Sequence, residues 1–493
     1  MILVLLLIIP FIGGIICWQI SYFNVVLSRF ISLLSMISIT YISLQLFIDF
    51  NNRTFNPDEW QLEFSIPWIT KLGIDFHLAT DGLSIIMILT TSILGIISIL
   101  CSWEIIKKYK GLFLLNLLWI IGSSLGIFLS ADMFLFFVFW EMILFPIYFI
   151  IIKWGNYYSI KDTIFIANRF FIYAQFSSLL MFLSIIKLVM LHYNQTGDLT
   201  FNYAILLKTD MNYIQECLVM SGFFLACVVK MPIVPFHGWL PKIHNNTPIY
   251  ASVDLVGIII KTSSYALIKF CIPFCPNISI KFAYIIRYIG IFTIIYGALM
   301  SFRQKNIKKF ISYASISHMG LILIAIFTRS MIVYQGLIIQ LISVSFSTSA
   351  LFIIFEQIYD RIHTHNINKM YGLWNSINYI PGFCLFFLMA NLGIPGTGNF
   401  IGEFLILIGT FQFYPIISCI CSFSLILTTI YSLFVMHKVF YGLNKNKRLL
   451  KNMSIREAII LILLVILLLS LGIYPQFILD TNHISVYNSQ YYI

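Results

Sequence analysis

Charged residues are scarce in this chain. They make up only 10% of its 493 residues, whereas 60% are hydrophobic. Ordinary soluble domains carry roughly 25% charged residues, because a soluble fold of this size needs a polar surface. The shortage of charge therefore excludes a soluble enzyme, a nucleic-acid-binding protein and a disordered scaffold. A polytopic membrane protein, surrounded mostly by lipid, is the class that remains.

Recognisable cofactor motifs are missing as well. The sequence has no GxGxxG, P-loop or CxxCH motif, and no carboxylates and imidazoles cluster at metal-ligand spacing. The nine cysteines include no CxxC pair, and Cys419 and Cys421 lie in an apolar run, which is typical of buried, inert thiols. We therefore expect this chain to bind no nucleotide, haem, iron–sulfur cluster or metal ion.

A cleavable targeting segment is not evident at the N-terminus. Residues 1–17 are apolar from the start, with no basic region and no convincing cleavage site, so they are typical of a first transmembrane span. If the protein resides in an organelle, this pattern indicates that it is made there. The abundance of Phe and Tyr, 46 and 27 residues, fits an AT-rich genome.

Apolar stretches of about 20 residues, the length that crosses a bilayer as a helix, recur along almost the whole chain. They predict an all-α polytopic membrane protein with about 14 spans. The expected spans are 1–18, 23–48, 82–102, 111–130, 132–152, 164–190, 217–240, 248–272, 283–302, 310–328, 331–357, 379–410, 413–437 and 455–475. The longest polar interruption is 49–80, followed by 191–215.

The net charge of +11 comes from basic residues in the loops between spans. If the loops alternate sides, one side receives Lys107, Lys108, Lys110, Lys153, Lys161, Arg303, Lys305, Lys308, Lys309, Arg361, Lys369, Lys445, Lys447, Arg448 and Lys451. The other side receives few, chiefly Arg53, Lys71, Lys208, Lys281 and Arg329. By the positive-inside rule, the lysine-rich side faces the cytoplasm or matrix. An even number of spans then places both termini on the opposite side.

Two spans are interrupted by helix-breaking residues. Residues 230–241 contain three prolines, and residues 393–399 contain one proline among three glycines. Proline removes a backbone donor and clashes with the preceding turn, so both helices are predicted to break within the membrane.

Each interrupted span is the fourth in a block of five, and five is odd, so the second block would be inverted relative to the first. Paired broken helices at corresponding positions are typical of transporters with inverted repeats. Two unrelated kinked helices are the alternative. The predicted divisions are N-terminal helices (1–110), a first repeat (111–272), a second, inverted repeat (273–437), and a C-terminal loop and helix (438–493).

Four charged residues fall within apolar spans. An ionisable side chain at bilayer depth is costly unless it is paired or hydrated, so each is a functional candidate. Glu141 and Lys261 lie in the middle of their spans. Lys230 ends a half-helix, where the helix dipole favours a cation, and Glu403 follows the second break. Because moving one proton changes the affinity of the next group, these acids and lysines favour proton transfer; structural ion pairs are the alternative.

Other polar residues in or near spans carry less weight. His318 is intramembrane and could pass protons near neutral pH, although a lone histidine in a helix is more often structural. Asp132 lies at a span boundary, where it could simply cap a helix, and Asp254 suggests no role. Three charges at the end of one span are expected to be solvated: Glu356, Asp360 and Arg361.

Several stretches together carry a family resemblance: 134–151, 230–241, 303–320, 359–361 and 391–407, with Lys261 in its helix. On these residues the sequence resembles the chain 4 family of antiporter-like proton-pumping subunits in NADH–ubiquinone oxidoreductase (respiratory complex I). The resemblance covers nearly the entire chain.

The resemblance implies a fold of 14 helices with two inverted five-helix repeats. It also implies that Glu141 pairs with Lys230, that Lys261 is the central relay and that Glu403 serves a second half-channel. Three histidines match family positions: His237, His244 and His318.

The resemblance further implies a place in the mitochondrial inner membrane, with synthesis inside the organelle. Expected partners are other membrane-arm subunits, including neighbouring antiporter-like subunits, together with lipid, internal water and protons, and no nucleic acid. NADH, FMN, iron–sulfur clusters and ubiquinone would be bound elsewhere in the complex.

The sequence also departs from the family pattern. The loop after Trp-Leu-Pro usually reads Glu-Ala-His-x-Glu-Ala-Pro, but Lys242 and Asn246 replace both acids here. An intramembrane histidine of the family aligns with Val344. The route between Lys261 and Glu403 is then expected to depend on water and on hydroxyls such as Ser345, Ser347 and Thr348.

The resulting hypothesis is a core subunit of an H⁺-translocating NADH:ubiquinone reductase, without a redox centre of its own. Protons would be taken up from the lysine-rich side, load Lys261 and leave past Glu403, gated by the Glu141–Lys230 pair. Two alternatives are a free-standing cation/proton antiporter and a non-pumping scaffold of the membrane arm.

Overall fold

The computed structural model describes residues 1–52, 60–104, 108–155, 160–248, 252–253, 255–374, 376–442 and 450–487. It divides into two compact units. Unit 1 comprises Met1–Met231, Ile258–Tyr284 and Phe477–Ile493, and unit 2 comprises Pro232–Gly257 and Ile285–Gln476.

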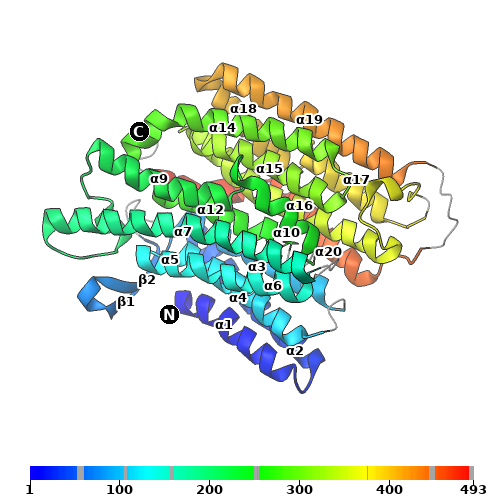
Figure 1. Cartoon of the computed structure of the whole chain (residues 1–493), viewed down its shortest axis with the longest axis horizontal. Coiled ribbons are helices and arrows are strands. Elements are labelled where there is room, and N and C mark those ends of the chain that lie inside the picture. Colours follow the sequence, from blue (N-terminus) through cyan, green and yellow to red (C-terminus); the bar gives the residue numbers. More distant parts are fainter. Residues whose placement is uncertain are drawn as a thin grey trace. The chain divides into compact units, whose positions relative to one another are not determined.

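Unit 1 contains the first nine helices, all but α8 labelled in Figure 1. These are α1 (Ile2–Ile20), α2 (Val25–Asn52), α3 (Gly82–Ser102), α4 (Lys110–Leu129), α5 (Met133–Met142), α6 (Leu144–Trp154), α7 (Ile160–Thr196), α8 (Tyr203–Leu206) and α9 (Tyr213–Lys230). A later segment joins the π-helical η3 (Leu255–Ile259), which begins in unit 2, to α12 (Ile260–Ala266), the π-helical η4 (Leu267–Cys271) and α13 (Ile272–Phe274). The last helix is α21 (Gln476–Tyr487).

Unit 2 begins with the short η2 (Phe236–Trp239) and α10 (Leu240–Asn246). Its longer helices are α14 (Pro276–Arg303, which starts in unit 1), α15 (Ile307–Ile326), α16 (Met331–Ile362), α17 (Ile380–Asn391), α18 (Gly398–Phe413), α19 (Pro415–Phe440) and α20 (Ile455–Ile473), with η5 (Ile367–Lys369) after α16. Helix α16 contacts α15, α17, α18 and α20, and its most apolar stretch is entirely buried.

The described residues include 13 helices long and apolar enough to cross a membrane. The predicted span at 379–410 is made of two shorter apolar helices, α17 and α18, so the expected number of about 14 is confirmed. The second predicted break is the segment between them, and the first lies between Lys230, the end of α9, and η2. The boundaries of the predicted repeats stay a prediction.

A proline also divides the span that carries Glu141. Helix α5 ends at Met142 and α6 begins at Leu144. Pro146 has no N–H to donate to the Met142 carbonyl, four residues earlier, and its ring crowds that carbonyl. The helix is therefore interrupted immediately after Glu141.

The polar interruption before α3 contains a β-hairpin, which the all-α prediction did not include. Strands β1 (Leu62–Ile69) and β2 (Ile74–Thr80) pair antiparallel beside α5 (Figure 1). Gly73 closes the turn with φ of 66°, and a Cβ there would lie 1.8 Å from the Leu199 carbonyl oxygen. Only glycine fits this turn, because a side chain would meet both backbone strain and a backbone clash.

Glycines bring α14 and α15 close together in unit 2. A Cβ on Gly297 would lie 2.7 Å from the Ser317 backbone nitrogen, and one on Gly320 would lie 2.7 Å from the Gly290 carbonyl oxygen. Small residues at such crossings allow helix backbones to approach each other. The crossing therefore determines where His318, the neighbour of Ser317, is held.

Candidate proton-transfer site

Glu141 lies on the last turn of α5 and is half-buried. Ser178 and Gln175 of α7 supply hydrogen-bonding side chains to its carboxyl group. Its Oε1 atom is buried and has no hydrogen-bond partner within the described part of the chain. The carboxyl group is thus held in place with one oxygen still able to accept a proton.

Lys230 is the last residue of α9 and is buried. Its Nζ atom lies 3.6 Å from the centre of the Trp140 ring, next in sequence to Glu141, a geometry that stabilises a cation. Lys230 and Glu141 interact electrostatically but form no direct ion pair within 4.0 Å among the described residues. The implied pairing of the two charges is therefore a through-space interaction beside an aromatic ring.

Lys261 lies on α12 and is only 2% exposed. Two π-helical segments, η3 and η4, flank this short helix, and such segments are frequent at functional sites. The next three residues, Thr262–Ser264, are also buried and all carry hydroxyl groups. The predicted central lysine thus lies in a polar stretch within the interior of unit 1.

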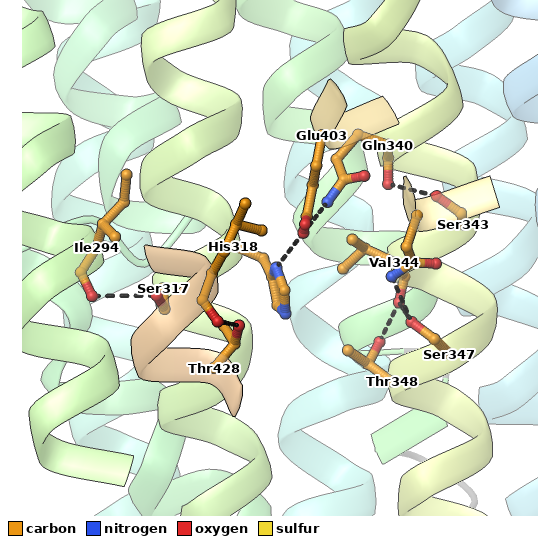
Figure 2. A network of polar contacts seen from close by, with 12 residues as sticks. Ile294, Ser317, His318, Gln340, Ser343, Val344, Ser347, Thr348, Glu403 and Thr428 are labelled. Carbon is orange, nitrogen blue, oxygen red and sulfur yellow. Dashed lines mark hydrogen bonds and ion pairs between the residues drawn. The ribbon is translucent and has the colours of Figure 1, made fainter. Parts of the chain in front are cut away.

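Glu403 meets two polar side chains in unit 2 (Figure 2). Its Oε1 atom accepts a hydrogen bond of 3.0 Å from Gln340 Nε2 and lies 3.5 Å from His318 Nδ1. All three side chains are buried. The sequence alone allowed either a functional or a structural role for His318. The structure places it next to the predicted carboxylate, Glu403.

The break between α17 and α18 reaches this carboxylate. Gly393 has φ of 71°, and a Cβ there would lie 2.8 Å from Glu403 Oε2. That oxygen, like His318 Nε2, is buried without a hydrogen-bond partner among the residues that the structure describes. The broken helix leaves room for the carboxyl group, and both partners of the pair keep one unused polar atom.

Val344, which the resemblance aligned with a histidine, is fully buried on α16 near this cluster (Figure 2). The hydroxyls of Ser345 and Thr348 donate to carbonyls of their own helix. Ser347 accepts a hydrogen bond of 3.3 Å from Asn399 at the start of α18. These hydroxyls are present and buried, but their role in a route from Lys261 stays a prediction.

The two other family histidines also lie in unit 2. The His237 ring packs edge-on against Tyr296, with the ring centres 4.9 Å apart. His244 is fully buried, and its ring centre lies 4.9 Å from that of Phe352. Among the described residues, no three His, Cys, Asp or Glu side chains gather as metal ligands would.

Several sequence-based expectations about charge at span ends are wrong. Glu356 was expected to be solvated, but it is 8% exposed because α16 continues to Ile362. Two residues counted among the loop charges are also buried, each on the first turn of a helix: Lys308 on α15 and Lys110 on α4. The Arg361 side chain, also expected to be solvated, is only 6% exposed and forms an ion pair of 2.7 Å with Glu457, whereas Asp360 is exposed as expected.

The remaining sequence-based expectations concern Asp254 and the pair Cys419 and Cys421. Asp254 lies outside the described residues. Cys419 is exposed on the surface of the chain, unlike its buried neighbour Cys421, so the expectation that both are buried is wrong for Cys419.

Three charged residues of unit 1 with little exposure were not identified from the sequence: Glu216, which is 3% exposed, and Lys269 and Asp81, whose side chains are each 17% exposed. Glu216 accepts a hydrogen bond of 3.0 Å from the backbone of Ile278, and Lys269 forms an ion pair with Asp81. The Lys269 Nζ atom also lies 4.5 Å from the centre of the Trp60 ring. The sequence signal for Asp81 was its position before an apolar run, three residues ahead of a serine, which predicts a helix cap.

Asp132 is the N-cap of α5, which confirms its interpretation as a helix cap. It is 1% exposed, and its carboxylate accepts hydrogen bonds from the backbone of Phe134 and Leu135. Burial raises the pKa of Asp132 to about 6, above its ordinary value of 3.8. Folding is therefore favoured when this carboxyl is protonated, and that contribution is lost as the pH rises through about 6.

Asp132→Asn keeps the cap and removes the charge, so it should stabilise the chain at pH 7.5 by roughly 1 to 3 kcal/mol. The gain should shrink as the pH is lowered towards 4.5, because the native carboxyl then becomes neutral. Thermal unfolding of the purified chain in detergent, followed over this pH range, measures it. A difference between the two chains that does not change with pH would contradict the assignment.

Comparison with known proteins gives one consistent family. The family model described as "NADH:quinone oxidoreductase/Mrp antiporter, TM" matches residues 130–430. NADH-quinone oxidoreductase subunit M of Escherichia coli (strain K12) is 48% identical over 497 residues, covering 99% of this chain and 98% of the relative. The Pseudomonas aeruginosa subunit M is 45% identical over 499 residues, covering 100% and 98%.

A solved structure agrees in fold. A chain of respiratory complex I from Thermus thermophilus with bound NADH superimposes with a TM-score of 0.87, at 24% sequence identity and with 100% of both chains covered. The fold described above is thus that of a known membrane protein.

Proposed function

This chain belongs to the NADH:quinone oxidoreductase/Mrp antiporter family of transmembrane proteins, and from this membership we propose that it is a proton-translocating membrane-arm subunit of NADH:quinone oxidoreductase. The 48% identity to a subunit of that enzyme, over almost the full length of both chains, is the observation that carries the proposal. NADH oxidation and quinone reduction take place in other subunits, and this chain moves protons across the membrane.

The proposed proton route uses the buried charges of both units. A change in the charge of Glu141 alters the proton affinity of Lys230 and, through it, that of Lys261. The Lys261 proton is then passed on towards His318 and Glu403, from which it is released. Each proton moved against the membrane potential requires about 2.3 kcal/mol per 100 mV, which the redox reaction supplies.

The relatives named above are bacterial, so they give no support to the mitochondrial location that the resemblance implied. We propose instead that the chain is a multi-pass protein of a bacterial respiratory membrane. Its partners there are the neighbouring antiporter-like subunits and the rest of the membrane arm.

A direct experiment can distinguish the proposed subunit from the alternative, a free-standing cation/proton antiporter. The chain is expected to co-purify in mild detergent with a large assembly that oxidises NADH. Vesicles containing that assembly should acidify only when NADH and quinone are both supplied. Purification of the chain alone, with Na⁺/H⁺ exchange that needs no electron donor, would overturn the proposal in favour of the antiporter.

A further inference from the structure

A second group of buried charges lies in unit 2, outside the route proposed above. Lys308 on α15 is fully buried, Glu356 on α16 is 8% exposed and His244 on α10 is fully buried. Helix α15 contacts both α10 and α16. Three titratable groups thus meet from three helices in the interior of one unit.

Their polar atoms are only partly satisfied. Lys308 Nζ donates a hydrogen bond of 3.2 Å to the Thr247 carbonyl and interacts electrostatically with Glu356 and with His244. Within the described part of the molecule, Glu356 Oε2 and both ring nitrogens of His244 lack hydrogen-bond partners. Buried charges arranged this loosely contribute little to stability, since the cost of removing them from water is not offset by close pairing.

The end of α16 connects this group to the solvent. Asp360 is exposed and lies one helical turn beyond Glu356, so the two carboxylates share a face of the helix. Both interact electrostatically with Lys308. His365 follows the end of α16 and also interacts electrostatically with Lys308. By the loop charges, this end of unit 2 lies on the lysine-rich side of the membrane.

Helix α15 carries both Lys308, at its start, and His318, further along the same helix. The two residues Lys308 and His318 are ten positions apart, a rise of about 15 Å along the helix. Ser312 and Ser315 lie between them, one and two turns beyond Lys308, and both are fully buried.

Helix α16 provides a second row of hydroxyls. Ser349 and Ser345 share a face with Glu356, two and three turns away, and the Ser349 Oγ atom is buried without a partner among the described residues. The same helix continues to Gln340, which donates to Glu403 (Figure 2). Polar groups on two packed helices thus extend from the buried charges to the His318–Glu403 pair.

We propose that Lys308 and Glu356, with His244 beside them, form a proton-loading site that supplies His318 and Glu403 from the lysine-rich side. This inference rests on the proposed function. In the resting form the pair is an ammonium and a carboxylate. A proton taken up past Asp360 converts the Glu356 carboxylate to a carboxylic acid. Transfer of one proton through the hydroxyl rows to neutral His318 restores the resting pair, and His318 then passes that proton to the Glu403 carboxylate.

The test uses the complete enzyme reconstituted in vesicles, with proton pumping measured per electron transferred. Glu356→Gln and Lys308→Met should each reduce pumping by about tenfold, below the roughly 10²–10⁴-fold that a positioned acid–base group supplies, because water can replace part of the path. Lys308→Arg, which keeps the cation, should retain most of the pumping. Glu216→Gln is the control: it neutralises a buried carboxylate that lies outside both proposed routes, and the amide oxygen can still accept the hydrogen bond from the Ile278 backbone.

The double variant Lys308→Met/Glu356→Gln separates proton loading from a purely structural ion pair. A structural pair predicts that losing both charges repairs the defect of losing one, because no unpaired buried charge is left. Proton loading predicts that the double variant assembles and still pumps poorly. Recovery of pumping in the double variant, or normal pumping in both single variants, would overturn the inference.

The same preparations show which proposal has failed. If Glu141→Gln and Lys261→Met impair pumping while the Lys308 and Glu356 variants do not, only the loading site is wrong. If none of the four variants impairs pumping, the proposed function of the chain is wrong as well.

Discussion

Replacing Glu141 by Gln should reduce redox-coupled proton pumping by about tenfold or more, since a positioned proton-transfer group contributes roughly 10²–10⁴-fold. The amide keeps the size of the side chain and its contacts with α7, but it can neither carry a charge nor influence Lys230. The measurement is the rate of NADH-driven acidification of vesicles containing the reconstituted complex.

The control for this change is Glu216→Gln. Glu216 is also a buried acid of unit 1, but its carboxylate accepts a hydrogen bond from the backbone of Ile278 and has no place in the proposed route. Its loss should affect stability more than pumping. Unchanged pumping by the Glu141→Gln complex would show that the Glu141–Lys230 interaction does not control proton transfer.

Replacing Lys261 by Met should cause a loss of similar size, because the central group of the route can no longer hold a proton. Methionine fills a similar volume without a charge, and Lys261 is only 2% exposed, so assembly should be retained. The complex is therefore expected to form, and the number of protons moved per electron is expected to fall.

Lys269→Met serves as the comparison on the next segment of the same chain. Lys269 forms an ion pair with Asp81, so its loss should lower the amount of assembled complex and leave the pumping of each complex unchanged. If Lys261→Met behaved in the same way, affecting assembly alone, the chain would be a non-pumping scaffold of the membrane arm.

The membrane fold could be predicted because lipid imposes a simple rule on the sequence. A segment that crosses the bilayer must satisfy its backbone hydrogen bonds internally, which requires a helix of about 20 apolar residues. The apolar runs therefore predicted the spans, and prolines and glycines predicted the breaks before η2 and α18. The hairpin at Leu62–Thr80 was missed because the same rule says nothing about segments outside the bilayer.

Only some of the buried charges could be predicted from the sequence, because a buried charge is recognisable only where it interrupts an apolar run. Glu141, Lys230, Lys261 and Glu403 were identified because a charge within an apolar run is conspicuous. Glu356 was dismissed because it lies near the end of a span, where charges are usually solvated. Burial at a span end depends on what packs over it, and that information is absent from any local stretch of sequence.

By itself, the sequence determined that this chain spans a membrane many times, where its helices break and which charges fall within its apolar spans, because these features follow from the local cost of placing polar groups in lipid. Only the tertiary structure decided which of those charges meet. His318 and Glu403, 85 positions apart in the chain, lie 3.5 Å from each other because α15 and α18 both pack against α16 in unit 2. Lys308 and Glu356 are buried together for the same reason: helix packing, not distance from a span end, decides which side chains lose contact with water.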